Sequence, residues 1–237
     1  MTSVYLIRHG QAGTRNRYDT LSELGRLQAC RLGETLAAHP VEFTSVLCGA
    51  LARQQETAAA VREAYERAGR DFPAVVTDAE WNEFDLDAVY RDLAPQLAAR
   101  DPQFRAGYEE MQAQMADDAH DIHRRWSDCD LALIRAWVGG KLPVETETWV
   151  VFQERIARAW NRLAGARGET AAVFTSATPI AIAAGIVLEV GTRTRFRLTG
   201  ALYNSAWTVL RIQGGEASLF SFNNIPHLND PSLRTFR

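Results

Sequence analysis

A short apolar run, VYLIRHGQ at residues 4–11, decides the fold class. Val4 to Ile7 are β-branched, aromatic or aliphatic, and the run ends at a glycine turn, which is typical of a buried strand in an α/β sheet. Arg8 and His9 follow the strand directly. In such sheets the ligand crevice lies beyond the carboxyl ends of the strands, so this pair is placed where a site is expected.

Helical and strand patterns alternate along most of the chain after this run. Helices are expected at residues 22–38, 51–67, 147–164 and 178–190. Thr178 is expected to cap the last of them, with Pro179 at its first position. Further strands are expected at residues 44–49, 73–77, 170–175, 203–212 and 217–222. This order predicts an α/β fold, a three-layer sandwich in which helices flank a mostly parallel central sheet with an antiparallel edge from the late hairpin.

The alternation stops between about residues 85 and 145. The pattern there is helical, with breaks expected at Pro95, Pro102 and Gly139–Gly140, and no strand is predicted. A chain of 237 residues is long enough to bury one large core. We therefore predict a single domain over residues 1–237 that carries a helical insertion at about 85–145.

The composition argues against several classes of protein. A net charge of −3 leaves no basic surplus to neutralise a nucleic-acid backbone. Cys30, Cys48 and Cys129 are widely spaced and form no metal-binding pattern. No apolar run reaches the roughly 20 residues of a membrane-spanning helix, and the first run is too short for a signal peptide. We expect a soluble cytoplasmic protein without a nucleic-acid or membrane partner.

Polar residues follow three of the predicted strands, in the sequences LIRHG, LCGALARQQET and VFTSATP. These strand ends bring Arg8, His9, Arg53 and Ser176 toward one crevice. A neutral imidazole can attack phosphorus while guanidinium groups hold the phosphoryl oxygens in forked hydrogen bonds. The combination predicts a site for phosphoryl transfer.

The motifs LIRHGQ, LSELGRLQA and RQQETA together carry a resemblance to a known family. The chain resembles the histidine phosphatase superfamily, which includes phosphoglycerate mutases and many small phosphomonoesterases. Weaker similarity resumes at VFTSATPI, LYNSAW and FNNIPHL. The resemblance therefore covers the two end regions of the chain and does not extend over its middle.

The resemblance implies a role for several residues. His9 is the nucleophile that is phosphorylated in turnover, and Arg8 and Arg53 bind the phosphate. Gly10 is expected to leave room for the phosphate because it has no side chain. Further positions placed beside the phosphate are Gln11, Ala177 and Thr178.

A carboxylic acid is also needed, to protonate the leaving oxygen and then to take a proton from the attacking water. Glu83, in the stretch AEWNEFDLD, is the first candidate because the family has a glutamate near this point. Glu80 is a competitor and Asp85 a weaker one.

The third strand end departs from the family pattern. The family has Ser-His-Gly-Gly or a similar sequence there, and the histidine donates to the phosphoryl oxygens. This chain has Thr175, Ser176, Ala177 and Thr178, so Ser176 replaces the histidine. Loss of one preorganised donor typically slows turnover by roughly 100- to 1,000-fold. The amino end of the helix that follows partly compensates by offering free amides and its positive dipole end.

Other charged and titratable residues admit two interpretations. Arg15 and Arg17, in the loop after the nucleophile, either bind a second anionic group of the substrate or belong to an ordinary solvated loop. His120 and His123 are interpreted as a solvated helix face, because no further metal ligands are evident. His227, in the tail, is interpreted as structural.

The leading hypothesis is a phosphomonoesterase that acts on a small phosphorylated substrate through phosphohistidine, with no cofactor and no metal. The alternative is a non-catalytic protein that binds a phosphorylated ligand, which Ser176 motivates. A phosphoglycerate mutase-type phosphotransferase is a weaker third option. The sequence leaves the oligomeric state open, with a homodimer as one option.

Overall fold

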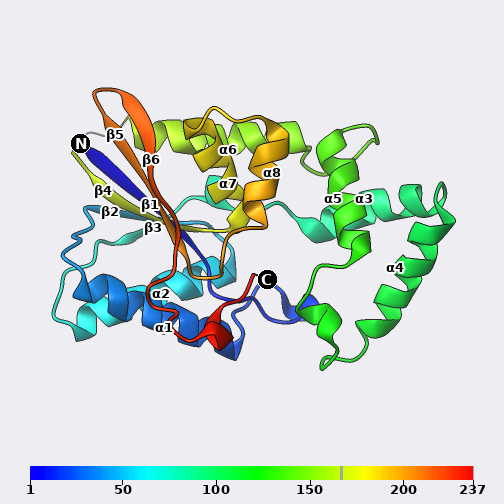
Figure 1. Cartoon of the computed structure of the whole chain (residues 1–237), viewed down its shortest axis with the longest axis horizontal. Helices are drawn as coiled ribbons and strands as arrows, with labels where there is room; N and C mark the ends of the chain where they lie inside the picture. The colour runs from blue at the N-terminus through cyan, green and yellow to red at the C-terminus, as the bar shows by residue number, and fades with distance from the viewer. Residues whose placement is uncertain (166–167, 237) are drawn as a thin grey trace. The chain divides into compact units, whose positions relative to one another are not determined.

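The computed structural model describes residues 1–165 and 168–236, which fall into two compact units (Figure 1). The first comprises Met1–Gly13, Arg17–Glu83 and the described part of Ile156–Phe236. The second comprises Thr14–Asn16 and Phe84–Arg155. The helical insertion predicted at about residues 85–145 lies within the second unit, and the single domain stays a prediction.

The first unit is built on one sheet whose order is β3-β2-β4-β1-β5-β6. The strands are β1 (Thr2–Arg8), β2 (Ser45–Cys48), β3 (Val75–Thr77), β4 (Thr170–Thr175), β5 (Trp207–Gln213) and β6 (Glu216–Asn224). β1, β2, β3 and β4 pair in parallel, and β5 and β6 pair antiparallel at one edge. The predicted α/β fold with a mostly parallel sheet is confirmed.

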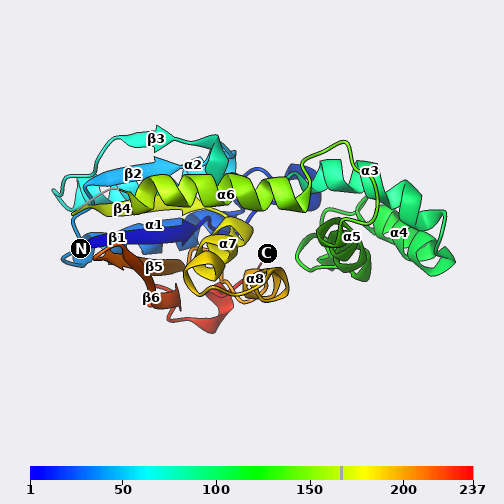
Figure 2. The ribbon, with the colours of Figure 1, turned by 90° about the horizontal axis from the view of Figure 1, so that it is seen from above.

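Helices cover both faces of this sheet. α1 (Glu23–Ala38) and α2 (Ala52–Arg67) lie on one face, as Figures 1 and 2 show, and their apolar residues pack on Ile7, Val46 and Phe174. α7 (Ala177–Val187) and the second half of α6 (Trp149–Ala164) lie on the other face. Ser22 caps α1 as predicted, because its hydroxyl oxygen accepts the Gly25 amide at 3.0 Å.

Two details of the helices differ from the prediction. α7 begins at Ala177, two residues before the first position expected at Pro179, because the extended residue Ser176, and not Thr178, is its N-cap. Thr178 and Pro179 therefore lie inside its first turn, where proline costs no hydrogen bond. α8 (Thr192–Thr199) was not predicted, because its sequence TRTRFRLT has no apolar stripe. In the structure none of its residues is buried.

The second unit is helical and contains α3 (Leu86–Ala98), α4 (Pro102–Gln114), α5 (Asp128–Gly139) and the start of α6. The break predicted at Pro95 is wrong, because this proline lies inside α3, whose buried residues Val89 and Leu93 hold the helix in place. Pro102 and Gly140 do delimit helices, at the first position of α4 and at the left-handed end of α5.

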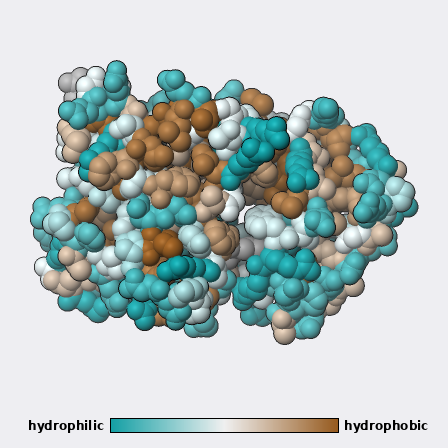
Figure 3. All heavy atoms as spheres, in the orientation of Figure 1, coloured by the Kyte–Doolittle hydropathy of each residue, from teal (hydrophilic) through white to brown (hydrophobic). Residues whose placement is uncertain are grey.

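Some large apolar side chains lie exposed on the surface. Large apolar side chains that stay exposed include Val76, Leu188 and Phe220. Figure 3 shows hydrophobic patches interspersed with hydrophilic residues on the face drawn. Apolar atoms cover more than half of an ordinary protein surface, so these residues need no partner to explain them. No helix in the described part of the chain is both long and apolar enough to cross a membrane.

Candidate active site

The neighbouring parallel strands β1 and β4 bring two predicted site segments together. Arg8 pairs with Thr175 in the strand register, and the His9 amide donates to the Thr175 carbonyl at 3.0 Å. Ser176 is the next residue of that second segment and directly precedes α7 as its N-cap. The carboxyl end of β2 leads into α2, which carries Arg53 in its first turn. The three strand ends predicted to converge are adjacent in the sheet.

His9 is a buried histidine with both ring nitrogens engaged. Its Nδ1 lies 2.6 Å from the carbonyl oxygen of Gly10, and its Nε2 accepts from Nε of Arg53 at 3.2 Å. The carbonyl can only accept, so Nδ1 carries the hydrogen and Nε2 carries the lone pair. Burial lowers the pKa of His9 well below its usual value, and the charges of Arg53 and Arg8 lower it further. The imidazole is therefore neutral at neutral pH, with a nucleophilic nitrogen.

The backbone after His9 is packed closely on the first helix. A side chain at Gly10 would meet the Gly25 carbonyl oxygen of α1 at 2.3 Å. Glycine is thus required here by helix packing, a reason that differs from the room for phosphate predicted from the sequence. The Gly10 amide donates to the Thr57 hydroxyl at 3.1 Å, and the Gln11 amide donates to Oε1 of Gln28 at 2.8 Å. These two bonds hold the backbone around the Gly10 carbonyl, whose oxygen accepts the hydrogen of His9 Nδ1.

Two buried arginines lie at these strand ends. Arg8 donates to the carbonyls of Leu202 and Phe236, the latter at 2.8 Å, while its Nε is buried and has no acceptor among the described residues. Burial lowers the pKa of Arg8 to about 10, so it stays charged at neutral pH. Arg53 donates from Nε to His9 and from Nη1 to Asp19 at 2.9 Å. Arg8 thus retains an unused donor.

The three candidate carboxylates have different surroundings. Oε2 of Glu83 accepts the amide of Thr178, in the first turn of α7, at 3.1 Å, and the Glu83 charge offsets part of the lowering of the Arg8 pKa by burial. Glu80 instead pairs with Arg158 and Arg162, at 3.2 Å from the Arg158 Nε. Partial burial raises the pKa of Glu80, but these two bonds outweigh it and lower the pKa. Asp85 caps α3 through the Ala88 amide. Of the three, Glu83 lies beside the predicted phosphate pocket.

Ser176 is buried and has a partner that the sequence did not suggest. Its Oγ accepts from Nε2 of Gln54 at 2.9 Å, and Ser176 makes no side-chain cap bond to α7. Ala177 and Thr178 are buried in the first turn of the same helix. Gln54 follows Arg53 directly in α2. This position next to a predicted site residue is the one feature of the sequence that could have indicated a role for Gln54 in the site.

Arg15 does not extend free into a solvated loop. Its guanidinium donates to Asp130, at 2.9 Å from Nη1 to Oδ1, and to the carbonyls of Ile122 and Arg125, all within the second unit. Both interpretations offered from the sequence are therefore replaced by a buried ion pair. Arg17 is exposed in a short 3₁₀ turn, as in the solvated-loop interpretation.

The histidines outside the strand ends also differ from a solvated helix face. His123 is buried and accepts the Arg15 amide on Nδ1 at 3.1 Å, so that interpretation is wrong for it. His120 precedes the short 3₁₀ turn Asp121–His123. The described residues contain no group of three or more His, Cys, Asp or Glu side chains that could hold a metal ion.

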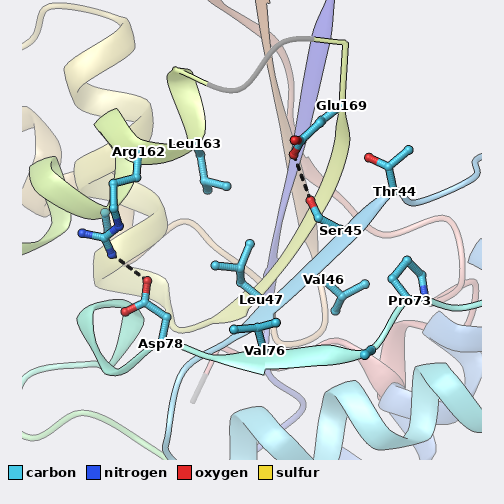
Figure 4. Close-up of a pocket in the computed structure, with 12 residues that line it drawn as sticks. Thr44, Ser45, Val46, Leu47, Pro73, Val76, Asp78, Arg162, Leu163 and Glu169 are labelled. Carbon is cyan, nitrogen blue, oxygen red and sulfur yellow. Dashed lines mark hydrogen bonds and ion pairs between the residues drawn. The ribbon is translucent and has the colours of Figure 1, made fainter.

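A separate pocket of about 500 Å³ lies between β2, β3 and α6 (Figure 4). Figure 4 shows an apolar floor that includes Leu47 and Val76, an ion pair between Asp78 and Arg162 at one end and Glu169 at the other. Glu169 precedes β4, so this pocket extends to the amino ends of the strands. None of the predicted site residues lines it.

The family is decided by a match to the model of the histidine phosphatase superfamily, branch 1, over residues 4–136. The chain belongs to the histidine phosphatase superfamily. The matched residues include most of β1 and His9 after it, α2 with Arg53, and Glu83. No curated protein matches the chain.

Solved structures of histidine phosphatase relatives share this fold at low sequence identity. YhfR of Bacillus stearothermophilus is 19% identical with a TM-score of 0.65, over 96% of this chain and 99% of that one. The α-ribazole phosphatase of Shigella flexneri is 21% identical with a TM-score of 0.61, over 94% and 96%. The phosphoglycerate mutase of Bacillus anthracis is 16% identical with a TM-score of 0.57, over 95% and 94%.

His227 should make the stability of this protein depend on pH. Its Nε2 lies 2.7 Å from the Ser205 hydroxyl, its Nδ1 is buried with no partner among the described residues, and burial lowers its pKa to about 4. The unfolded chain, with a pKa near 6.5, binds the proton first as pH falls. His227 should therefore cost about 3 kcal/mol of stability between pH 6.5 and 4, and none above that window.

Urea unfolding of wild type and His227→Gln at pH 4.5 and 7.5 measures this contribution. The variant should lose less stability than wild type between the two pH values. His39→Gln, at an exposed histidine, is the matched control and should behave as wild type. Equal pH dependence in wild type and His227→Gln would show that His227 takes up its proton as readily in the folded chain.

Proposed function

We propose that this chain is a phosphomonoesterase that works through a phosphohistidine at His9. The observation that carries the proposal is that a neutral His9, with its lone pair on Nε2, lies at the same strand ends as two donors that have no acceptor among the described residues. Nε of Arg8 is buried without an acceptor in the described part of the chain. The Ser176 Oγ accepts from Gln54, and no residue in the described part of the chain accepts the hydrogen of this hydroxyl. Buried donors without acceptors are costly, and a phosphoryl group supplies the missing acceptors.

The reaction follows in two steps. Nε2 of His9 attacks phosphorus, the bond from phosphorus to the leaving oxygen breaks, and the Glu83 carboxyl gives that oxygen a proton. Water then attacks the phosphohistidine, the phosphorus–Nε2 bond breaks, and the Glu83 carboxylate takes the water proton. Arg8 and Arg53 hold the phosphoryl oxygens, with Arg53 transferring its Nε bond from His9 to oxygen. This scheme uses no metal and no cofactor, because the arginines supply the positive charge.

The substrate class is a small phosphate monoester, in keeping with two arginines that together match one dianion. A net charge of −3 supports a small-molecule substrate over nucleic acid. We also propose that the protein acts in the cytoplasm.

A second candidate is a protein that binds a phosphorylated ligand without turning it over, and Ser176 is the observation that favours it. A hydroxyl donor carries no charge and stabilises the transition state less than an imidazolium. Hydrolysis of p-nitrophenyl phosphate by wild type and His9→Ala separates the two candidates. The phosphatase predicts turnover that falls to background in His9→Ala, whereas equal background rates together with calorimetric binding of inorganic phosphate would favour the non-catalytic protein.

A further inference from the structure

Gln54 is a fully buried amide whose orientation is determined from both ends. Its Nε2 donates to the Trp81 carbonyl at 3.3 Å and to Oγ of Ser176 at 2.9 Å, and its Oε1 accepts the Leu51 amide at 3.4 Å. A carbonyl can only accept and a backbone amide can only donate, so a flipped amide would lose both bonds. The NH₂ group therefore faces Ser176.

The Gln54 side chain also packs closely on Gly49. A Cβ added at Gly49 would lie 2.0 Å from Oε1 of Gln54. The amide thus lies directly against the backbone at the end of β2. Both hydrogens of its NH₂ group are used, one on Trp81 and one on Ser176.

This arrangement decides what the Ser176 hydroxyl can do. Because Oγ accepts from Gln54, the hydroxyl hydrogen has to point in another direction. No described residue accepts it. Ser176 follows Thr175, whose carbonyl accepts the His9 amide, so the hydroxyl lies at the strand end that carries the nucleophile. An oxygen of a phosphoryl group on His9 is the acceptor that the site lacks.

We propose that Gln54 is a positioning residue that sets the Ser176 hydroxyl to donate to the phosphoryl oxygen. The inference rests on the proposed phosphatase function and extends it. Gln54 and Ser176 then act as one donor unit: Ser176 contacts the substrate, and Gln54 acts only through Ser176. No proton is transferred by Gln54, and no bond forms or breaks at either residue.

A double-mutant cycle on turnover tests this. Gln54→Met keeps the volume and removes the donor, and it should lower kcat about tenfold with KM within about twofold, since one hydrogen bond is lost. Ser176→Ala should lower kcat about 100-fold. The double variant should match Ser176→Ala alone, because Gln54 has no effect without the hydroxyl. Gln54→Ala is measured in parallel in case the Gln54→Met variant folds poorly, and it should give the same pattern.

Gln55→Met is the matched control, since it is the same substitution at the next, exposed residue, and its kcat should equal that of wild type. Thermal unfolding of each variant accompanies the kinetics. If Gln54→Met slows wild type and Ser176→Ala by the same factor, its role is structural and the inference is overturned, while the phosphatase function stands. If wild type shows no turnover that depends on His9, the proposed function fails and the inference fails with it.

Discussion

Glu83→Gln is expected to slow hydrolysis of an alkyl phosphate by about 100- to 10,000-fold, the range typical of loss of a general acid. Glutamine keeps an oxygen that accepts the Thr178 amide, so the fold around α7 should be preserved. With p-nitrophenyl phosphate the first step needs no proton, because p-nitrophenolate is a stable leaving group. That substrate should release one equivalent of p-nitrophenolate in a fast burst, followed by slow turnover, because water is no longer deprotonated.

Stopped-flow absorbance measures the burst, and phosphate release measures turnover of the alkyl ester. Glu80→Gln is the matched control and should change both rates by less than about threefold, since Glu80 pairs with Arg158 and Arg162 instead. A Glu83→Gln enzyme that cleaves both substrates at the wild-type rate would remove Glu83 from the mechanism. A large loss in Glu80→Gln would give the role to Glu80.

Asp130→Ala is expected to destabilise the second unit by about 3 to 5 kcal/mol, the usual cost of breaking a buried ion pair from one side. The Asp130 side chain is 0% exposed and Arg15 is 6% exposed. The carboxylate also accepts from the Tyr90 hydroxyl at 2.6 Å and from the Ser127 amide at 2.6 Å. In the variant the Arg15 charge stays buried without its carboxylate partner. The Tyr90 hydroxyl and the Ser127 amide also lose their acceptor.

Urea unfolding together with hydrogen exchange over α3 and α5 measures the loss. Asp121→Ala is the control, because Asp121 pairs with Arg125 on the surface and such pairs contribute about 0 to 1 kcal/mol. A loss for Asp130→Ala no larger than for Asp121→Ala would mean that the buried network contributes little. Faster exchange should appear in α5, where Asp130 lies in the first turn.

The strand ends were predictable because their signals are local. The apolar run before Arg8, the glycine after His9 and the strand before α2 each follow from a few neighbouring residues. Parallel pairing of β1 with β4 then places Ser176 next to His9 without further information. This reasoning is general for parallel sheets, where the carboxyl ends of strands meet at one edge.

The contacts that sequence reasoning missed depend on residues far apart in the chain. Arg15 pairs with Asp130, and Gln54 with Ser176, more than 100 positions away in each case. No periodicity or motif marks such a pair, because the partner is chosen by tertiary packing. Gly10 was expected to leave room for the phosphate, whereas the atom that a side chain there would meet is the Gly25 carbonyl oxygen of α1. Local patterns thus identify the reactive residues, and the fold decides which side chains support them.

In the proposed reaction His9 carries the phosphoryl group. The most direct measurement mixes Glu83→Gln protein with p-nitrophenyl phosphate, quenches under alkaline denaturing conditions that preserve phosphohistidine, and locates the phosphate by peptide mass spectrometry. We expect close to one phosphate per chain on the peptide that contains His9, and none when His9→Ala is added to the same variant. Release of p-nitrophenolate without any phosphate on His9, or with phosphate on another residue, would contradict it.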